Sequence, residues 1–95
     1  MAVPVHRMGD TNSAGGAVTS IPQSTVYANG LLVVVNGSLG TSHDPFEIPH
    51  IAGTWNTANG GPTVLVEGIP ANGTGDADSC GHPRASGSPD VFIAD

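Results

Sequence analysis

Hydrophobic residues along this chain occur in short runs that are rich in β-branched side chains. Each run is bounded by glycine, proline or asparagine, which is typical of strands joined by turns. The clearest runs cover residues 24–28, 31–35, 63–66 and 91–93. Asn29-Gly30 is a strong hairpin signal because both residues tolerate positive φ. The pattern predicts a hairpin over residues 26–35 and a counterpart over residues 64–71, closed at Glu67-Gly68.

These turns belong to a frame that repeats along the chain. A Thr-Val pair and two glycines occur as Thr25-Val26, Gly30 and Gly37, and again 38 residues later as Thr63-Val64, Gly68 and Gly75. A third, partial copy runs from Asp90 to Asp95, and the segment from Ala2 to Asp10 continues it. A repeat this short cannot bury a core alone, so the copies must pack on one another. We interpret the chain as three units around an axis, one of them assembled from both termini, which should therefore be neighbours.

Composition supports a single all-β domain spanning residues 1–95. The chain contains 14 glycines and 8 prolines, which leave no window for a long amphipathic helix. Four aromatic residues among 95 make a thin core, and small domains of this kind often need an additional staple. A single cysteine excludes an intramolecular disulfide. A bound metal or a partner surface remains as the source of extra stability.

The charge balance argues against nucleic acid and membrane partners. The net charge is −6, there is no lysine, and Arg7 and Arg84 are the only strong cations. Phosphate neutralisation and basic membrane patches both need more positive charge. No segment approaches the roughly 20 apolar residues of a membrane-spanning helix, so stable membrane insertion is not expected. Residues 1–16 lack the apolar centre of a signal peptide, so we expect synthesis in the cytoplasm without a secretory leader.

Four histidines and one cysteine are many soft or borderline metal ligands for so small a chain. Cys80 and His82 are two residues apart, so in an extended segment both face the same side. His43 and His50 flank a loop with two prolines that could bring them together. Repeat positions place His43, Cys80 and Ala14 at equivalent corners, which converge near a threefold axis. Three imidazoles and one thiolate form a closed tetrahedral set that favours zinc over magnesium or calcium.

Other interpretations of these residues are available. A histidine alone is more often a hydrogen-bonded group than a ligand, and a buried cysteine often packs as a small apolar residue. We interpret His6 as structural, with counterparts Val34 and Asn72, although it could replace one of the four ligands. Trp55 and Tyr27 are expected to pack. The Gly-Asp pairs at 9–10 and 75–76 are expected to form turns in which the aspartate caps nearby amides.

The ordered series of motifs resembles PAAR-domain proteins, the family that forms the sharp tip of contractile injection spikes. The family pattern, Gly-x-Pro-Ala-Ala-Arg-x-Gly-Asp followed by a ligand-bearing turn, is similar to residues 68–80 and, from its proline onward, to residues 4–13. Residues 87–92 resemble the family's repeated Gly-Ser-x-x-Val-Phe strand. The chain departs from the pattern at Ala14, where many members carry histidine, and in the alanines and arginine of the signature.

The resemblance implies a small conical domain of short strands and hairpins with pseudo-threefold symmetry. Its broad base would sit on the blunt end of a trimeric β-helical spike, with a metal near the apex. In this family the metal is typically zinc held by three histidines and one cysteine, and iron is the less favoured alternative. Carried over by position, the ligands are His43, Cys80, His82 and His50, the last replacing the histidine missing at Ala14.

We therefore expect a structural protein without enzymatic activity or a small-molecule substrate. One copy would cap each spike trimer, in a phage tail baseplate or a type VI secretion apparatus, and help it pierce a membrane. With no domain expected beyond Asp95, it would be a bare tip located in the virion or at the end of the secreted apparatus. One alternative is a small zinc hydrolase, with Asp44 and Glu47 as the nearby acids. Another is a metal-independent adaptor that docks proteins onto a trimer.

Overall fold

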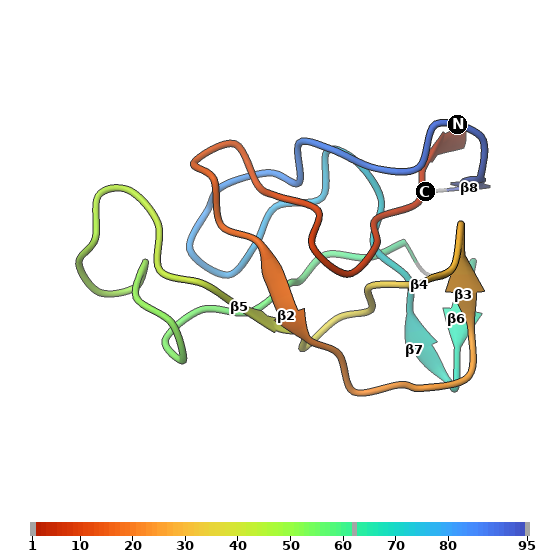
Figure 1. The fold of residues 1–95 in the computed structure, drawn as a ribbon, viewed down its shortest axis with the longest axis horizontal. Coiled ribbons are helices and arrows are strands. Elements are labelled where there is room, and N and C mark those ends of the chain that lie inside the picture. The colour runs from red at the N-terminus through yellow and green to blue at the C-terminus, as the bar shows by residue number, and fades with distance from the viewer. Residues whose placement is uncertain (1, 62, 95) are drawn as a thin grey trace.

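The computed structural model describes residues 2–61 and 63–94, and within them every regular element is a short β-strand (Figure 1). The strands form four antiparallel pairs, β1 with β8, β2 with β5, β3 with β4 and β6 with β7. Their bounds are β1 Ala2–Pro4, β2 Val18–Ser20, β3 Tyr27–Ala28, β4 Leu31–Leu32, β5 Leu39–Gly40, β6 Leu65–Val66, β7 Ile69–Pro70 and β8 Phe92–Ala94. The all-β prediction is confirmed for the described residues.

The two predicted hairpins are present and have the same turn. β3 and β4 flank Asn29-Gly30, with φ values of 55° and 77°, and β6 and β7 flank Glu67-Gly68, with φ values of 51° and 80°. Two successive residues with positive φ define the tight turn whose twist matches that of the flanking strands. Glu67 adopts this conformation although it lacks the permissiveness of glycine or asparagine, so the surrounding structure imposes it.

The chain ends form a third pair equivalent to these hairpins. β1 and β8 pair in the same register, since Val3 opposes Ile93 as Leu31 opposes Ala28 in the first hairpin. The two termini therefore lie side by side, as the repeat predicts (Figure 1). The predicted end of the third copy, Asp95, lies outside the described residues.

A closed ring of backbone hydrogen bonds joins the three copies. The amide of His6 donates to Asn72, that of Asn72 to Val34, and that of Val34 back to His6, at 3.0, 2.9 and 2.9 Å. All three residues are fully buried. They are the counterparts expected from the repeat, so the ring connects one equivalent position from each copy. Isolated antiparallel β-bridges between residues next to the ring join the copies in the same cyclic order. They pair Val5 with Gly73, Val33 with Arg7 and Ala71 with Val35.

The turns that leave this ring are also repeated. They contain glycines with φ near +90°, and the amides of these glycines donate to a carbonyl further along their own copy: Gly9 to Val18, Gly37 to Thr57 and Gly75 to Arg84. In two copies the following aspartate caps the turn. Asp10 accepts from the amide of Arg7 at 2.8 Å, and Asp76 accepts from that of Gly73 at 2.9 Å. The predicted capping role of both aspartates is confirmed.

The middle copy contains an insertion. Val18 and Arg84 each follow the glycine of their turn, Gly9 and Gly75, by nine positions, whereas Thr57 follows Gly37 by twenty. The amides of residues 13, 41 and 79 donate in cyclic order to the carbonyls of residues 83, 17 and 56, which places eleven extra residues between residues 41 and 56. Counting on from residue 41, we take residues 43–53 as the inserted loop. This inserted loop lies at the far end of the long axis from the hairpins (Figure 1). It also corrects the repeat alignment, because Ser42 and not His43 is the counterpart of Ala14 and Cys80.

Two differently composed cores fill the molecule. Beneath the hairpins lies an apolar cluster of Val5, Ala28, Val33, Val35, Val66 and Ala71. Next to it lies a polar core centred on Arg84, whose guanidinium pairs with Asp78 at 2.8 Å and lies 2.9 Å from His6 Nε2. Neither side chain of the Arg84–Asp78 pair is exposed. Burial raises the pKa of Asp78 and lowers that of Arg84, while each partner's charge opposes the shift.

Because His6 is buried beside a guanidinium, the stability of the fold should depend on pH. Burial, and then the charge of Arg84, lower the pKa of His6 to about 4 from an ordinary value of 6.5. Between these values the unfolded chain binds a proton that the folded chain does not. The free energy of unfolding should therefore fall by up to about 3 kcal/mol as pH drops from 6.5 to 4.

The matched variant is His6→Asn, because the equivalent position of another copy holds Asn72. Urea unfolding of both proteins across this pH range measures the effect, and any contribution from other histidines is common to both. We expect the free energy of unfolding to fall less steeply with pH in His6→Asn, because the unfolded variant no longer takes up a proton at residue 6. Identical slopes in the two proteins would contradict the assignment.

Candidate metal centre

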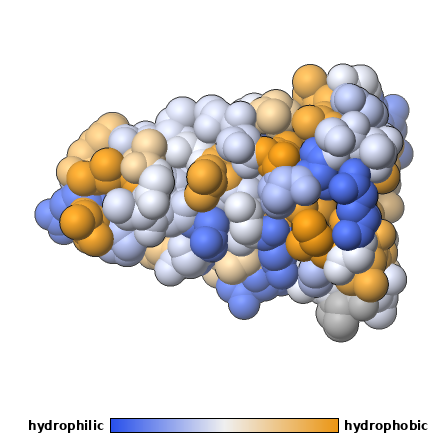
Figure 2. Space-filling model, turned by 90° about the horizontal axis from the view of Figure 1, so that it is seen from below, coloured by the Kyte–Doolittle hydropathy of each residue, from blue (hydrophilic) through white to orange (hydrophobic). Residues whose placement is uncertain are grey.

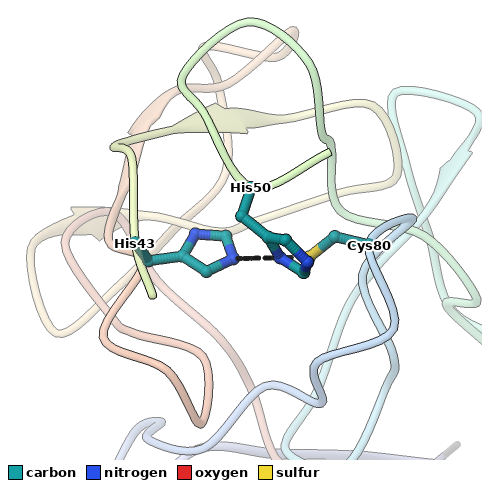
Figure 3. Close-up of side chains that lie close together, drawn as sticks. All are labelled: His43, His50 and Cys80. Atoms are coloured by element: carbon teal, nitrogen blue, oxygen red, sulfur yellow. Dashed lines mark hydrogen bonds between the residues drawn. The ribbon is translucent and has the colours of Figure 1, made fainter. Parts of the chain in front are cut away.

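Three of the predicted ligands converge at one point (Figure 3). His43 begins the inserted loop, His50 lies near its end, and Cys80 belongs to a turn of the C-terminal copy. His43 Nε2 lies 3.2 Å from His50 Nδ1 and 3.5 Å from Cys80 Sγ. The three donor atoms all lie within 4.8 Å of one another. Residues far apart in the sequence thus present two imidazole nitrogens and one sulfur to a common centre that could hold a metal ion.

These separations can be compared with the geometry of a tetrahedral metal site. Zinc binds histidine nitrogen at about 2.0–2.1 Å and cysteine sulfur at about 2.3 Å. Tetrahedral angles then place two nitrogens about 3.3 Å apart and a nitrogen and a sulfur about 3.6 Å apart. The observed 3.2 and 3.5 Å are close to both values. The donor set therefore fits a small tetrahedral ion without rearrangement around His43.

His82 lies beside this group without belonging to it by donor distance. The centroid of its ring is 5.2 Å from that of His43 and 4.9 Å from that of His50. Its Nδ1 is 3.5 Å from the hydroxyl of Ser13. Its Nε2 is buried and has no hydrogen-bond partner among the described residues. Burying a nitrogen without a hydrogen-bond partner costs free energy, and a metal ion bound at this centre could remove that cost by binding His82 Nε2.

The position of His43 is fixed by its neighbours. Its Nδ1 lies 3.4 Å from the carbonyl oxygen of Thr41, so a proton on Nδ1 leaves the lone pair of Nε2 free to bind a metal. The indole of Trp55 donates to the same carbonyl at 3.1 Å and meets the His43 ring edge-on at 5.0 Å. Burial lowers the pKa of His43, which favours the neutral, ligating form. A Cβ at Gly16 would lie 2.6 Å from His43 Nδ1, so only glycine leaves room for the ring.

The turn that carries Cys80 is closed by its own backbone. The amide of Asp78 donates to the carbonyl of His82, and the amide of Gly81 donates back to Asp78, both at 2.8 Å. Gly81 has a φ of 97°, which a residue with a side chain rarely adopts. Cys80 and His82 therefore project from one tight turn, and the Asp78 side chain at its base reaches into the polar core.

The inserted loop folds back on itself. The amide of His43 donates to the carbonyl of His50 at 3.0 Å, and that of Phe46 donates to His43 at 2.7 Å. The prediction that this loop brings the two histidines together is confirmed. His6 is in a different environment, since its Nε2 faces Arg84 and the residue is fully buried in the ring.

Sequence reasoning missed the residues behind the ligands. Asp78 and Arg84 were not recognised as a pair, although they flank the Cys80–His82 motif symmetrically, two residues away on each side. The chain has few charged residues, so two opposite charges at this spacing were the sequence signal that could have indicated an ion pair. The role of Gly16 had no sequence signal, because it depends on a close approach between two copies.

Comparison with known proteins adds no identification, because no protein-family model matches the chain and no curated protein matches its sequence at a significant level. Within residues 2–61 and 63–94, no helix has the length and apolar character needed to cross a membrane.

The metal centre makes a direct prediction for Cys80. The protein purified from metal-supplemented medium should contain about one metal ion per chain, and Cys80→Ser should lose most of it because the thiolate is the strongest donor of the set. Its melting temperature should fall as well, since an ion that binds only the folded chain stabilises it. Elemental analysis and thermal unfolding measure both effects.

The control is His6→Asn, which changes a buried histidine outside the centre and should retain its metal. Full metal content and unchanged melting in Cys80→Ser would argue against the site. Complete loss of metal in His6→Asn, beyond the partial weakening that its contact with Arg84 could transmit, would show that the ligand set is misassigned.

Proposed function

We propose that this chain is the structural tip of a contractile injection machine, a non-enzymatic cap seated on a trimeric β-helical spike. The observation that carries the proposal is an exposed apolar residue repeated at the same position of all three hairpins. Tyr27, Leu65 and Phe92 are 59%, 57% and 55% exposed. In register they oppose Leu32, Pro70 and Pro4, the equivalent residues of the partner strands.

Such repetition suits a partner with threefold symmetry. A homotrimer presents three identical surfaces, and a single chain can contact all of them only if its own contacts recur about a matching axis. Large apolar side chains left exposed in this way are typical of interaction sites. Tyr27, which we expected to pack inside the domain, is instead available for such a contact.

Hydrogen bonds between neighbouring hairpins support a surface that is already formed before binding. The Asn29 side chain donates to Asp90 at 2.7 Å, and the Thr25 hydroxyl donates to Glu67 at 2.6 Å. The equivalent hydroxyl of Thr63 lies 3.4 Å from the carbonyl of Ala94. Each hairpin turn thus contacts the first residues of another copy, and the three contacts surround the base, which is the end of the molecule formed by the hairpins. Preorganisation of this kind reduces the ordering cost of binding.

The shape supports a conical tip with its metal toward the apex. The space-filling view narrows from the hairpin end toward the other end of the long axis, where the inserted loop lies (Figure 2). His43 and His50 both belong to this loop. A metal bound there would fasten the loop to the Cys80 turn, so that the narrow end resists deformation. This is the mechanical role that we propose for the ion during membrane piercing.

We propose zinc as the ion, with His82 as the fourth ligand. The donor types suit zinc, and iron is the less favoured alternative. The His82 ring lies 4.9 Å from the His50 ring and 5.2 Å from the His43 ring between centroids, and its buried Nε2 has no hydrogen-bond partner among the described residues. Four protein ligands leave no open position for a catalytic water, which is why we favour a structural role over a zinc hydrolase. Retention of metal by the purified protein would in turn argue against the metal-independent adaptor.

We propose accordingly that the chain works in a phage tail baseplate or a type VI secretion apparatus, in the virion or at the secreted tip. The stoichiometry of binding tests this. Native mass spectrometry of the chain co-expressed with trimeric β-helical spikes should detect one chain per trimer and little binding to a monomeric spike fragment. Three chains per trimer, or no complex with any of several spikes, would contradict the proposal.

The contact residues can be tested separately. Substituting Tyr27, Leu65 or Phe92 by Ser should each weaken binding by about tenfold or more, because a buried side chain of this size contributes roughly 1.5–3 kcal/mol. The matched control is Phe46→Ser, which removes a 64% exposed aromatic side chain from the inserted loop. Its affinity for the spike should be unchanged. If Phe46→Ser weakened spike binding as much as the three hairpin variants, the spike would not bind at the hairpins.

A further inference from the structure

We propose that the buried Asp78–Arg84 ion pair positions the metal ligands, so that the affinity of the centre depends on two residues that do not touch the ion. This inference rests on the metal centre proposed above. Its basis is that Arg84 lies behind both ligand-bearing segments, the Cys80 turn and the beginning of the inserted loop. The two segments come from different copies, and the ion pair connects them.

The first connection runs through Asp78 to the Cys80 turn. One carboxylate oxygen of Asp78 accepts from Arg84 at 2.8 Å and from the Asn12 side chain at 2.9 Å. The backbone of Asp78 meanwhile accepts from Gly81 and donates to His82. A residue fixed by its side chain therefore closes the turn from which Cys80 and His82 project. Movement of Asp78 would be transmitted to both potential ligands.

The second connection runs through Trp55 to His43. The guanidinium carbon of Arg84 lies 5.5 Å from the centroid of the Trp55 ring. The same indole contacts the His43 ring, 5.0 Å away and nearly perpendicular. Arg84 also donates to the carbonyl of Gly16 at 3.1 Å, in the segment where any side chain would displace His43. Arg84 thus fixes two of the surfaces against which His43 packs.

The repeat itself shows that the fold does not require a charge here. The equivalents of Arg84 in the other copies are Val18 and Thr57, which are also buried and make the same backbone hydrogen bond with the preceding turn. A buried ion pair is expensive to desolvate, and apolar replacements are often as stable or more so. Asp78 Oδ1 and Arg84 Nε even lack hydrogen-bond partners among the described residues. The copy that carries the charge pair is the one that carries Cys80 and His82.

The decisive variant is Asp78→Asn with Arg84→Met, which removes both charges and leaves neither unpaired. Zinc affinity is measured by competition with a chromophoric chelator, and site geometry by the thiolate-to-metal absorption of the Co²⁺ form. We expect about 10- to 100-fold weaker zinc binding, the range typical of outer contacts of metal ligands, and an altered Co²⁺ spectrum. The melting temperature of the metal-free variant, compared with that of the metal-free parent, measures separately what the pair and the Arg84 contacts with His6 and Gly16 contribute to overall stability.

Val66→Ala provides the control for general destabilisation, because it creates a cavity in the apolar core beneath the hairpins. It should lower the melting temperature without changing the Co²⁺ spectrum. If the double variant does not fold, Asp78→Asn alone, which is nearly isosteric, replaces it, and its zinc affinity must fall below that of Val66→Ala.

Each outcome is decisive. Unchanged zinc affinity and Co²⁺ spectrum in the charge-free variant would overturn the positioning role and leave the centre intact. A parent protein that binds neither Zn²⁺ nor Co²⁺ would overturn the centre and this inference together. A loss of affinity no larger than that of Val66→Ala would show that the pair acts only through overall stability.

Discussion

The ring of three backbone hydrogen bonds among His6, Val34 and Asn72 is the constraint on which the rest of the structure depends. Each copy donates to one neighbour and accepts from the other, so no copy can satisfy its buried backbone groups without the remaining two. The ring also explains how strands of only two or three residues persist, since their turns leave a connected framework and are not isolated hairpins. Pairing of the chain ends as β1 and β8 follows from the same requirement, because the third copy exists only when both are in place.

The candidate metal ligands lie where the three copies differ from one another. A strictly repeated chain would place identical groups around the axis, whereas a metal needs a converging set of different donors. The inserted loop 43–53 carries His43 and His50 and holds them beside Cys80, which lies in a turn of another copy. The corner at Ala14 contributes no donor, and Gly16 beside it contributes space for the His43 ring. Each copy therefore has a different part in one site.

The sequence predicted the features that depend on local chemistry or on counting. Asn29-Gly30 and Glu67-Gly68 close the expected hairpins, and the equivalence of His6, Val34 and Asn72 follows from spacing alone. The convergence of His43, His50 and Cys80 was also predictable, because their types and flanking turns are visible in the chain. The alignment of His43 with Cys80 was wrong, since an insertion can be placed only once the cyclic hydrogen bonds are known. β2 and β5 were missed because they pair across copies and have little pattern of their own.

The Arg84–Asp78 pair was the feature least accessible to sequence reasoning, and the reason is physical. An arginine in a chain with two cations is expected at the surface, because burial of a guanidinium without a partner is prohibitive. Its burial becomes possible only when Asp78, His6 and the Gly16 carbonyl, drawn from two copies, meet at one place. That meeting is itself a product of the ring, which brings the N-terminal and C-terminal segments into one unit. The polar core and the donor cluster thus depend on the same closure of the N-terminal and C-terminal strands.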